Sequence, residues 1–147
     1  MGTHKGTWKH FEREVAAYFG SHRVPLSGMS NYIQKGDVLH EFLHVECKYR
    51  AQWPKYVPLE FAGRLIINGE YVMWCKPVGK NGKKGEEIVA EAILREGTSL
   101  EVLFAYTEKE AAEKIPVVAL KKKGHVGFVL MCRKEHYEKV KSYVVQN

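Results

Sequence analysis

Hydrophobic and polar residues alternate along the first part of the chain with the period of an amphipathic helix. Over residues 7–19, apolar side chains recur every three or four positions and polar ones lie between them. Gly20 follows the last apolar position and is a common helix stop. The spacing predicts a helix whose apolar face consists of Trp8, Phe11, Val15, Tyr18 and Phe19.

One acidic residue interrupts this apolar face. Glu12 lies four positions after Trp8 and three before Val15, so it falls inside the stripe. A carboxylate in such a place is costly to bury unless it is paired, protonated or bound to a cation. Glu12 is therefore either an edge carboxylate that reaches solvent or an arginine, or part of a buried charged site.

The hydrophobic period changes to two after Gly36. From Leu43 onward every second residue is apolar, which predicts a strand with one face in the core. The opposite face then displays three polar residues, His44, Glu46 and Lys48. We expect Asp37 to lie near the start of a short preceding strand, beside Glu46 across a hairpin.

The rest of the chain predicts further strands and helices. Asn68-Gly69 is a hairpin signal, and residues 86–97 have the pattern of a short helix. Thr98-Ser99-Leu100-Glu101 is a capping box that opens another helix, ended before Pro116. Two strands joined near Lys123-Gly124 and a terminal amphipathic helix over residues 134–145 follow. We expect one α/β domain over residues 1–147, with a central mixed β-sheet flanked by helices.

Composition and charge narrow the class of protein. The chain has 147 residues, 45% of them hydrophobic, which is enough for one ordinary core. No apolar run approaches the roughly 20 residues of a membrane span, and the three cysteines form no disulfide framework. We therefore expect an intracellular, cytoplasmic protein with no membrane contact.

The net charge of +6 is concentrated at the two ends of the chain. Residues 1–50 carry seven Lys/Arg against five acids, and residues 121–147 carry seven against two. The segment between them has nine against ten. Basic ends are typical of a polyanion-binding protein, because neutralised phosphates release counterions, although a solvated basic surface has the same composition.

Residues 36–50 contain two incompatible motifs. His40, Glu41 and His44 match the HExxH pattern, in which a helix turns two imidazoles onto one zinc ion. On a strand, the same two histidines lie roughly 13 Å apart and cannot share a metal. The strand prediction therefore disfavours a zinc hydrolase.

The second motif, Asp37 followed by Glu46-Cys47-Lys48, suits a strand. Glu46 and Lys48 are two residues apart and share a face, and the carbonyl of Cys47 is free to turn toward a metal. With Asp37 alongside, they form the hard, oxygen-rich site that Mg²⁺ prefers, where Mn²⁺ commonly substitutes. Lys48 can orient a water or stabilise a phosphate. A helix packed on this sheet could aim Glu12 at the same cation.

With these motifs the chain resembles the PD-(D/E)xK nuclease superfamily, and within it the archaeal-type Holliday junction resolvases and their phage-encoded relatives. The matching parts are Lys5-Gly6 leading into Phe11-Glu12-Arg13-Glu14, Ser27-Gly28-Met29-Ser30, Gly36-Asp37 and Val45-Glu46-Cys47-Lys48, and residues 115–128 resemble the family's later strand pair. The resemblance covers residues 5–50 well and residues 98–133 loosely. It implies a restriction-endonuclease-like core.

The resemblance also implies a function. It describes a homodimeric, metal-dependent endonuclease that resolves four-way DNA junctions by paired phosphodiester hydrolysis. Glu12, Asp37, Glu46 and the Cys47 carbonyl would hold the metal, Lys48 would be catalytic, and Ser27 or Ser30 would contact the scissile strand. The residues expected to bind DNA, Ser27 among them, are Lys5, Lys9, Arg13, Arg23, Ser27, Lys35, Arg50, Lys80, Lys83 and Lys84.

Two departures from the family pattern leave alternatives open. The spacing from Asp37 to Glu46 is short for the family, and residues 51–97 have no counterpart in it. The alternatives are a nuclease of the same superfamily with another DNA substrate, of restriction or repair type, and a noncatalytic nucleic-acid-binding module. Trp8, Phe11 and Phe19 fit a core stripe better than a base-stacking platform, which does not favour the binding module.

Overall fold

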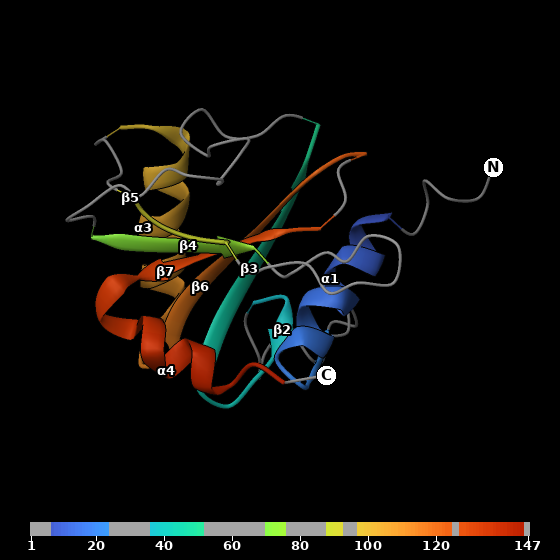
Figure 1. Cartoon of the computed structure of the whole chain (residues 1–147), viewed down its shortest axis with the longest axis horizontal. Helices are drawn as coiled ribbons and strands as arrows, with labels where there is room; N and C mark the ends of the chain where they lie inside the picture. The colour runs from blue at the N-terminus through green and yellow to red at the C-terminus, as the bar shows by residue number, and fades with distance from the viewer. Residues whose placement is uncertain are drawn as a thin grey trace.

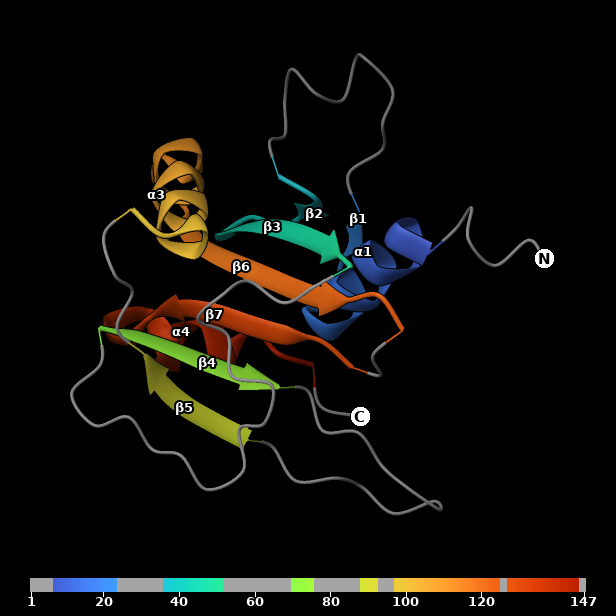
Figure 2. The same ribbon diagram turned by 90° about the horizontal axis from the view of Figure 1, so that it is seen from above.

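The computed structural model describes residues 7–23, 36–51, 70–75, 88–92, 97–124 and 127–145. Its centre is a mixed five-stranded sheet in the order β3-β6-β7-β4-β5, which can be followed in Figure 2. β3 and β6 run parallel, and the other neighbours are antiparallel. The strands are β3 (Leu43–Arg50), β4 (Tyr71–Cys75), β5 (Ile88–Ala92), β6 (Ile115–Lys122) and β7 (Val129–Arg133).

The helices and a two-stranded sheet are arranged around this sheet (Figure 1). Their bounds are α1 (Thr7–Tyr18), β1 (His22–Arg23), β2 (Val38–Leu39), α3 (Ser99–Ala111), the 3-10 turn η2 (Lys134–His136) and α4 (Tyr137–Ser142). β2 pairs with β1, antiparallel, and not with β3. The predicted α/β class, a mixed sheet flanked by helices, is confirmed.

Two separate apolar clusters cover the two faces of the sheet. Along β6, Val117 and Ala119 pack into the cluster that contains residues of α1 and α4, while Val118 and Leu120 pack into the one under α3. This alternation follows from the two-residue period of a strand. β6 is buried on both faces, whereas β3 forms one edge of the sheet.

The predicted first helix is confirmed, with one exception on its apolar face. Phe11 and Val15 are almost completely buried, and Gly20, at φ 68°, lies just beyond the helix end. A side chain at Gly20 would collide with Val145, which packs against the end of α1. Trp8 was predicted to lie in the core but remains 39% exposed, so this part of the prediction is wrong.

The predicted capping box is present at the start of α3. Thr98 is the N-cap, and its Oγ1 accepts a hydrogen bond from the Glu101 N–H at 3.3 Å. The Glu101 carboxylate in return accepts from the Gly97 N–H at 3.0 Å. The first bond satisfies an N–H group that the helix start leaves unpaired, and the second holds the residue that precedes the N-cap.

The helix predicted over residues 86–97 is wrong. Residues 88–92 form β5, which pairs antiparallel with β4 in the register Tyr71↔Ala92. The Ala and Glu residues here favour a helix locally, but the open edge of β4 offers ladder hydrogen bonds that outweigh this preference. The segment without a family counterpart, residues 51–97, thus supplies two strands of the sheet. The Asn68-Gly69 hairpin lies outside the described residues.

Candidate functional site

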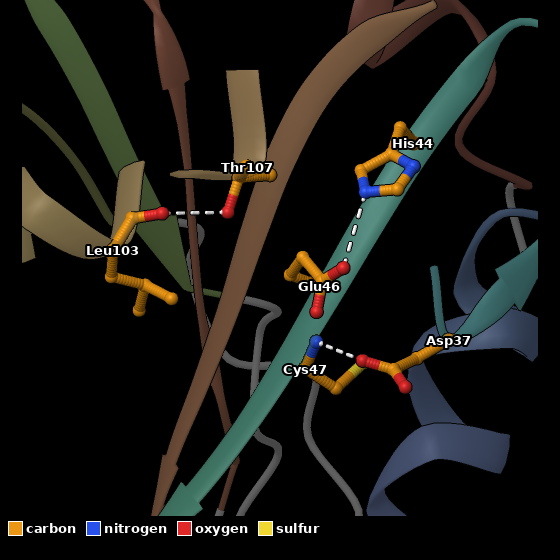
Figure 3. A network of polar contacts seen from close by, with 6 residues as sticks. All are labelled: Asp37, His44, Glu46, Cys47, Leu103 and Thr107. Carbon is orange, nitrogen blue, oxygen red and sulfur yellow. Dashed lines mark hydrogen bonds and ion pairs between the residues drawn. The ribbon is translucent and has the colours of Figure 1, made fainter. Parts of the chain in front are cut away.

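Asp37 is bound by two hydrogen bonds to the open edge of β3, which is the edge that pairs with no other described strand of the five-stranded sheet. Its N–H donates to the Val45 carbonyl at 2.9 Å, and its Oδ2 accepts from the Cys47 N–H at 2.7 Å (Figure 3). The N–H and C=O of one strand residue point to the same edge, so the Cys47 carbonyl also faces this side. The predicted proximity of Asp37 to Glu46 and Cys47 is therefore borne out, although no regular hairpin produces it.

Gly36 makes this close approach possible. Its φ is 89°, and a Cβ there would lie 3.1 Å from the Val45 carbonyl oxygen and 3.2 Å from the His44 ring. A larger residue would be strained in this conformation and crowded by both neighbours. The backbone at Gly36 therefore fixes the position of Asp37 relative to β3.

The Asp37 carboxyl is held in an environment that disfavours its charge. Burial is the largest cause and raises its pKa from 3.8 to about 6. The Cys47 N–H opposes the rise, the negative charges of Glu46 and Glu12 add to it, and Lys48 lowers it. Glu46, Glu12 and Lys48 are thus each within electrostatic reach of Asp37.

Glu46 has a partner that the sequence did not single out. The Nε2 of His44, a side chain only 2% exposed, lies 3.1 Å from Glu46 Oε1 (Figure 3). The two residues are two apart on β3 and share the face that α3 covers. The sequence predicted only that His44 lies on the polar face of this strand, and the structure shows that it is hydrogen-bonded there. This contact orients the Glu46 carboxylate.

Glu12 and Lys48 line the same pocket, which lies beside Cys47. Glu12 is 8% exposed, in agreement with its predicted place inside the apolar stripe. The pocket has a volume of about 280 Å³ and is lined by Trp8, Phe11, Glu12, Cys47, Lys48, Tyr49 and Arg50. Cys47 lines this pocket and also donates to Asp37, so Glu12 and Lys48 lie next to that hydrogen bond. Glu46, on the α3 face of β3, does not line the pocket.

The residues present fit a divalent cation only in part. Over the described ranges, no three His, Cys, Asp or Glu side chains are close enough to hold a metal ion together. Mg²⁺, however, is commonly held by one or two carboxylates while waters and substrate phosphates complete its shell. Asp37 and the Cys47 carbonyl offer such a partial set on one edge, and the neighbouring carboxylates raise the negative potential there. A cation at Asp37 would offset the burial and the carboxylate repulsion that together raise its pKa.

The zinc motif is not formed. His40 lies between β2 and β3, outside both strands, and its Nδ1 accepts hydrogen bonds from the N–H groups of Phe42 and Leu43 at 3.0 and 3.1 Å. His44 belongs to the strand, so the two imidazoles do not share a helical face. Burial also raises the pKa of the Cys47 thiol well above 9.0, which disfavours a thiolate ligand.

The residues predicted to bind DNA are only partly described. Lys9 and Arg13 lie on α1, with the Lys9 ammonium 5.5 Å from the centre of the Trp8 ring, and Arg50 lines the pocket. The backbone of Arg23 belongs to β1. Lys121, near the end of β6, has its Nζ 3.4 Å from Oε1 of Glu14 on α1. The predicted residues outside the described ranges are Lys5, Ser27, Ser30, Lys35, Lys80, Lys83 and Lys84.

No protein-family model, curated protein or solved structure matches the chain. Among the described residues, no helix is both long and apolar enough to cross a membrane. Sequence reasoning missed the His44–Glu46 contact and the exposure of Trp8. The alternation of His44 with core residues located its face but could not identify its partner.

Proposed function

We propose that the chain is a metal-dependent endonuclease that hydrolyses phosphodiester bonds in DNA, with Mg²⁺ or Mn²⁺ as its cofactor. The observation that carries this proposal is the position of Asp37 on the open edge of β3. There its carboxylate is partly buried beside Cys47 and within electrostatic reach of Glu46, Glu12 and Lys48. Buried carboxylates with perturbed pKa values at a pocket are typical of catalytic sites.

The chain's own residues have separable roles in this reaction. Asp37 and Glu46 present carboxylate oxygens, and His44 keeps Glu46 in one orientation. Lys48 reaches the pocket, where it can orient the attacking water or neutralise charge that develops on the scissile phosphate. A divalent cation, when bound, would activate that water and polarise the phosphate.

A four-way DNA junction is the substrate that we propose, with a homodimer as the active form. The support is the motif resemblance and the excess of basic residues at both ends of the chain. Phosphate contacts position a protein on DNA without reading its sequence, which suits recognition of a branched shape. An intracellular location follows from this substrate.

The proposal is tested by incubating the protein with an end-labelled four-way junction and with its matching linear duplex, each with and without Mg²⁺. Metal-dependent, paired nicks on the junction alone are expected. Equal cutting of the linear duplex would refute the junction preference and favour a nuclease of restriction or repair type. Salt-sensitive binding without cutting under Mg²⁺ or Mn²⁺ would refute the enzyme and favour the noncatalytic module.

A further inference from the structure

Trp8 differs from the other aromatic residues of α1. Phe11 is 1% exposed and packs against Tyr49 and Phe128, with ring centres 6.4 and 5.8 Å apart. Trp8 retains 39% of its surface although it occupies the same helical stripe. An indole kept at the surface loses part of the free energy that burial would supply. Its location in the pocket suggests another use.

The pocket that Trp8 lines follows the open edge of β3. It spans Cys47 to Arg50, which is about 10 Å along the strand at about 3.3 Å per residue. One end of the pocket is lined by Cys47, whose N–H donates a hydrogen bond to Asp37. A nucleotide in this pocket would therefore be a close neighbour of the phosphate bound at Asp37.

The groups that line the pocket combine an aromatic surface with two cationic side chains and one carboxylate, that of Glu12. Lys48 and Arg50 share it with Trp8, and the Lys9 ammonium lies 5.5 Å from the indole centre. Proteins that bind single-stranded DNA use this combination, because aromatic rings stack on bases while cations follow the backbone. Tyr49 adds a second aromatic group to the lining.

We propose that this pocket receives one unpaired nucleobase of a DNA strand, stacked on Trp8, with the adjoining phosphates bound by Lys48 and Arg50. The inference rests on the proposed function for the identity of the ligand and specifies which part of the DNA the site recognises. Bases in a continuous duplex are already stacked, and extracting one costs a few kcal/mol. The pocket therefore favours DNA in which a base is unpaired, as at a distorted branch point.

The test measures, by fluorescence anisotropy, the binding of a fluorescently labelled oligothymidylate of 15 nucleotides in the absence of divalent metal. Trp8→Ala should weaken binding about 5- to 50-fold, as expected for loss of one stacked base. Trp8→Phe should restore most of the affinity, because phenylalanine also presents a ring face. Tyr106→Ala is the matched control, since Tyr106 is an exposed aromatic residue of α3.

Two results would overturn the proposal: equal affinity of Trp8→Ala and the wild-type protein, or equal losses in Trp8→Ala and Tyr106→Ala. Thermal unfolding of each variant identifies a loss that is due only to misfolding. The assay requires no cleavage, so it separates the pocket from the enzyme. Loss of binding in Trp8→Ala from a protein that cuts no DNA would keep the stacking site and refute the nuclease.

Discussion

β3 and β6 are parallel neighbours in one sheet, yet they place different residues under α3. In register, Glu46 lies beside Val118 and Lys48 beside Leu120. Val118 and Leu120 are buried in the apolar cluster that α3 covers. The same face of the sheet thus accommodates apolar residues on one strand while its neighbour carries a charged row.

The difference indicates which residues are needed for packing. Apolar side chains on β6 stabilise the fold by burial, and the polar row on β3 contributes little of this kind. Asp37 is held where burial and two other carboxylates disfavour its charge, which costs stability. Locally unfavourable groups that are kept in place by the surrounding structure are expected at functional sites. Substitutions in the polar row of β3 should therefore lower the cleavage rate, and substitutions of apolar residues on β6 should lower the free energy of unfolding.

Among single substitutions on β3, the largest effect on catalysis is expected from Lys48→Ala. Without the ammonium group, cleavage of the junction should slow by about 100- to 1,000-fold, because charge on the phosphate is no longer stabilised. Lys109→Ala, at an exposed position of α3, is the control and should leave the rate unchanged. Single-turnover rates measure the difference, and a Lys48→Ala enzyme that cuts at the wild-type rate would refute the assigned role.

Leu120→Ala tests the β6 side of the comparison. Leu120 is almost fully buried, and its truncation should lower the free energy of unfolding by about 2–4 kcal/mol. Urea denaturation measures this change. The cleavage rate of the fraction that remains folded should stay close to that of the wild-type protein. A large rate loss in fully folded Leu120→Ala would mean that β6 belongs to the catalytic region.

Asp37→Asn should increase the free energy of unfolding at pH 7.5, by at most about 3 kcal/mol for a pKa moved from 3.8 to about 6. The folded protein binds a proton at Asp37 more tightly than the unfolded chain, so wild-type stability falls as pH rises from about 4 to about 6. Asparagine carries no ionisable carboxyl, so this loss of stability does not occur, and its side-chain oxygen can still accept a hydrogen bond from the Cys47 N–H. The free energies of unfolding of the wild-type protein and Asp37→Asn, measured without divalent metal, should diverge as pH rises through this range. The same pH dependence in both proteins would contradict the burial argument.

His44 tests whether orientation of Glu46 matters. His44→Phe fills a similar volume but removes the hydrogen bond, and cleavage should fall about 10- to 100-fold, the usual range for residues that position a metal ligand. His44→Gln retains a nitrogen donor and should recover most of the rate at saturating DNA. Equal rates for the two variants would show that only packing at this position is important.

Local patterns in the sequence predicted much of the fold. The stripe from Phe11 to Phe19, the alternation along β3 and the capping box at Thr98 are all short-range features, and each forms as predicted. β5 was mispredicted because its structure depends on the edge of β4, which no local pattern reveals. A strand is recognised by its neighbours as much as by its own residues.

Only part of the candidate site was predicted from the sequence. Asp37, Glu46 and Lys48 were identified from residue type and from their shared strand. The approach of Gly36 to β3 and the contact of His44 with Glu46 depend on three-dimensional packing. Trp8 has the spacing of a core residue, and only its measured exposure distinguishes it from Phe11.

The most direct test of the account compares Asp37→Asn with Glu41→Gln in cleavage of the four-way junction under Mg²⁺. Both changes replace a carboxylate by an amide, but Glu41 is exposed and lies outside the site, so it controls for charge. We predict that Asp37→Asn abolishes cutting while junction binding survives, and that Glu41→Gln cuts at the wild-type rate. Full cleavage by Asp37→Asn would contradict the central claim, because the Asp37 carboxylate would then have no part in the chemistry.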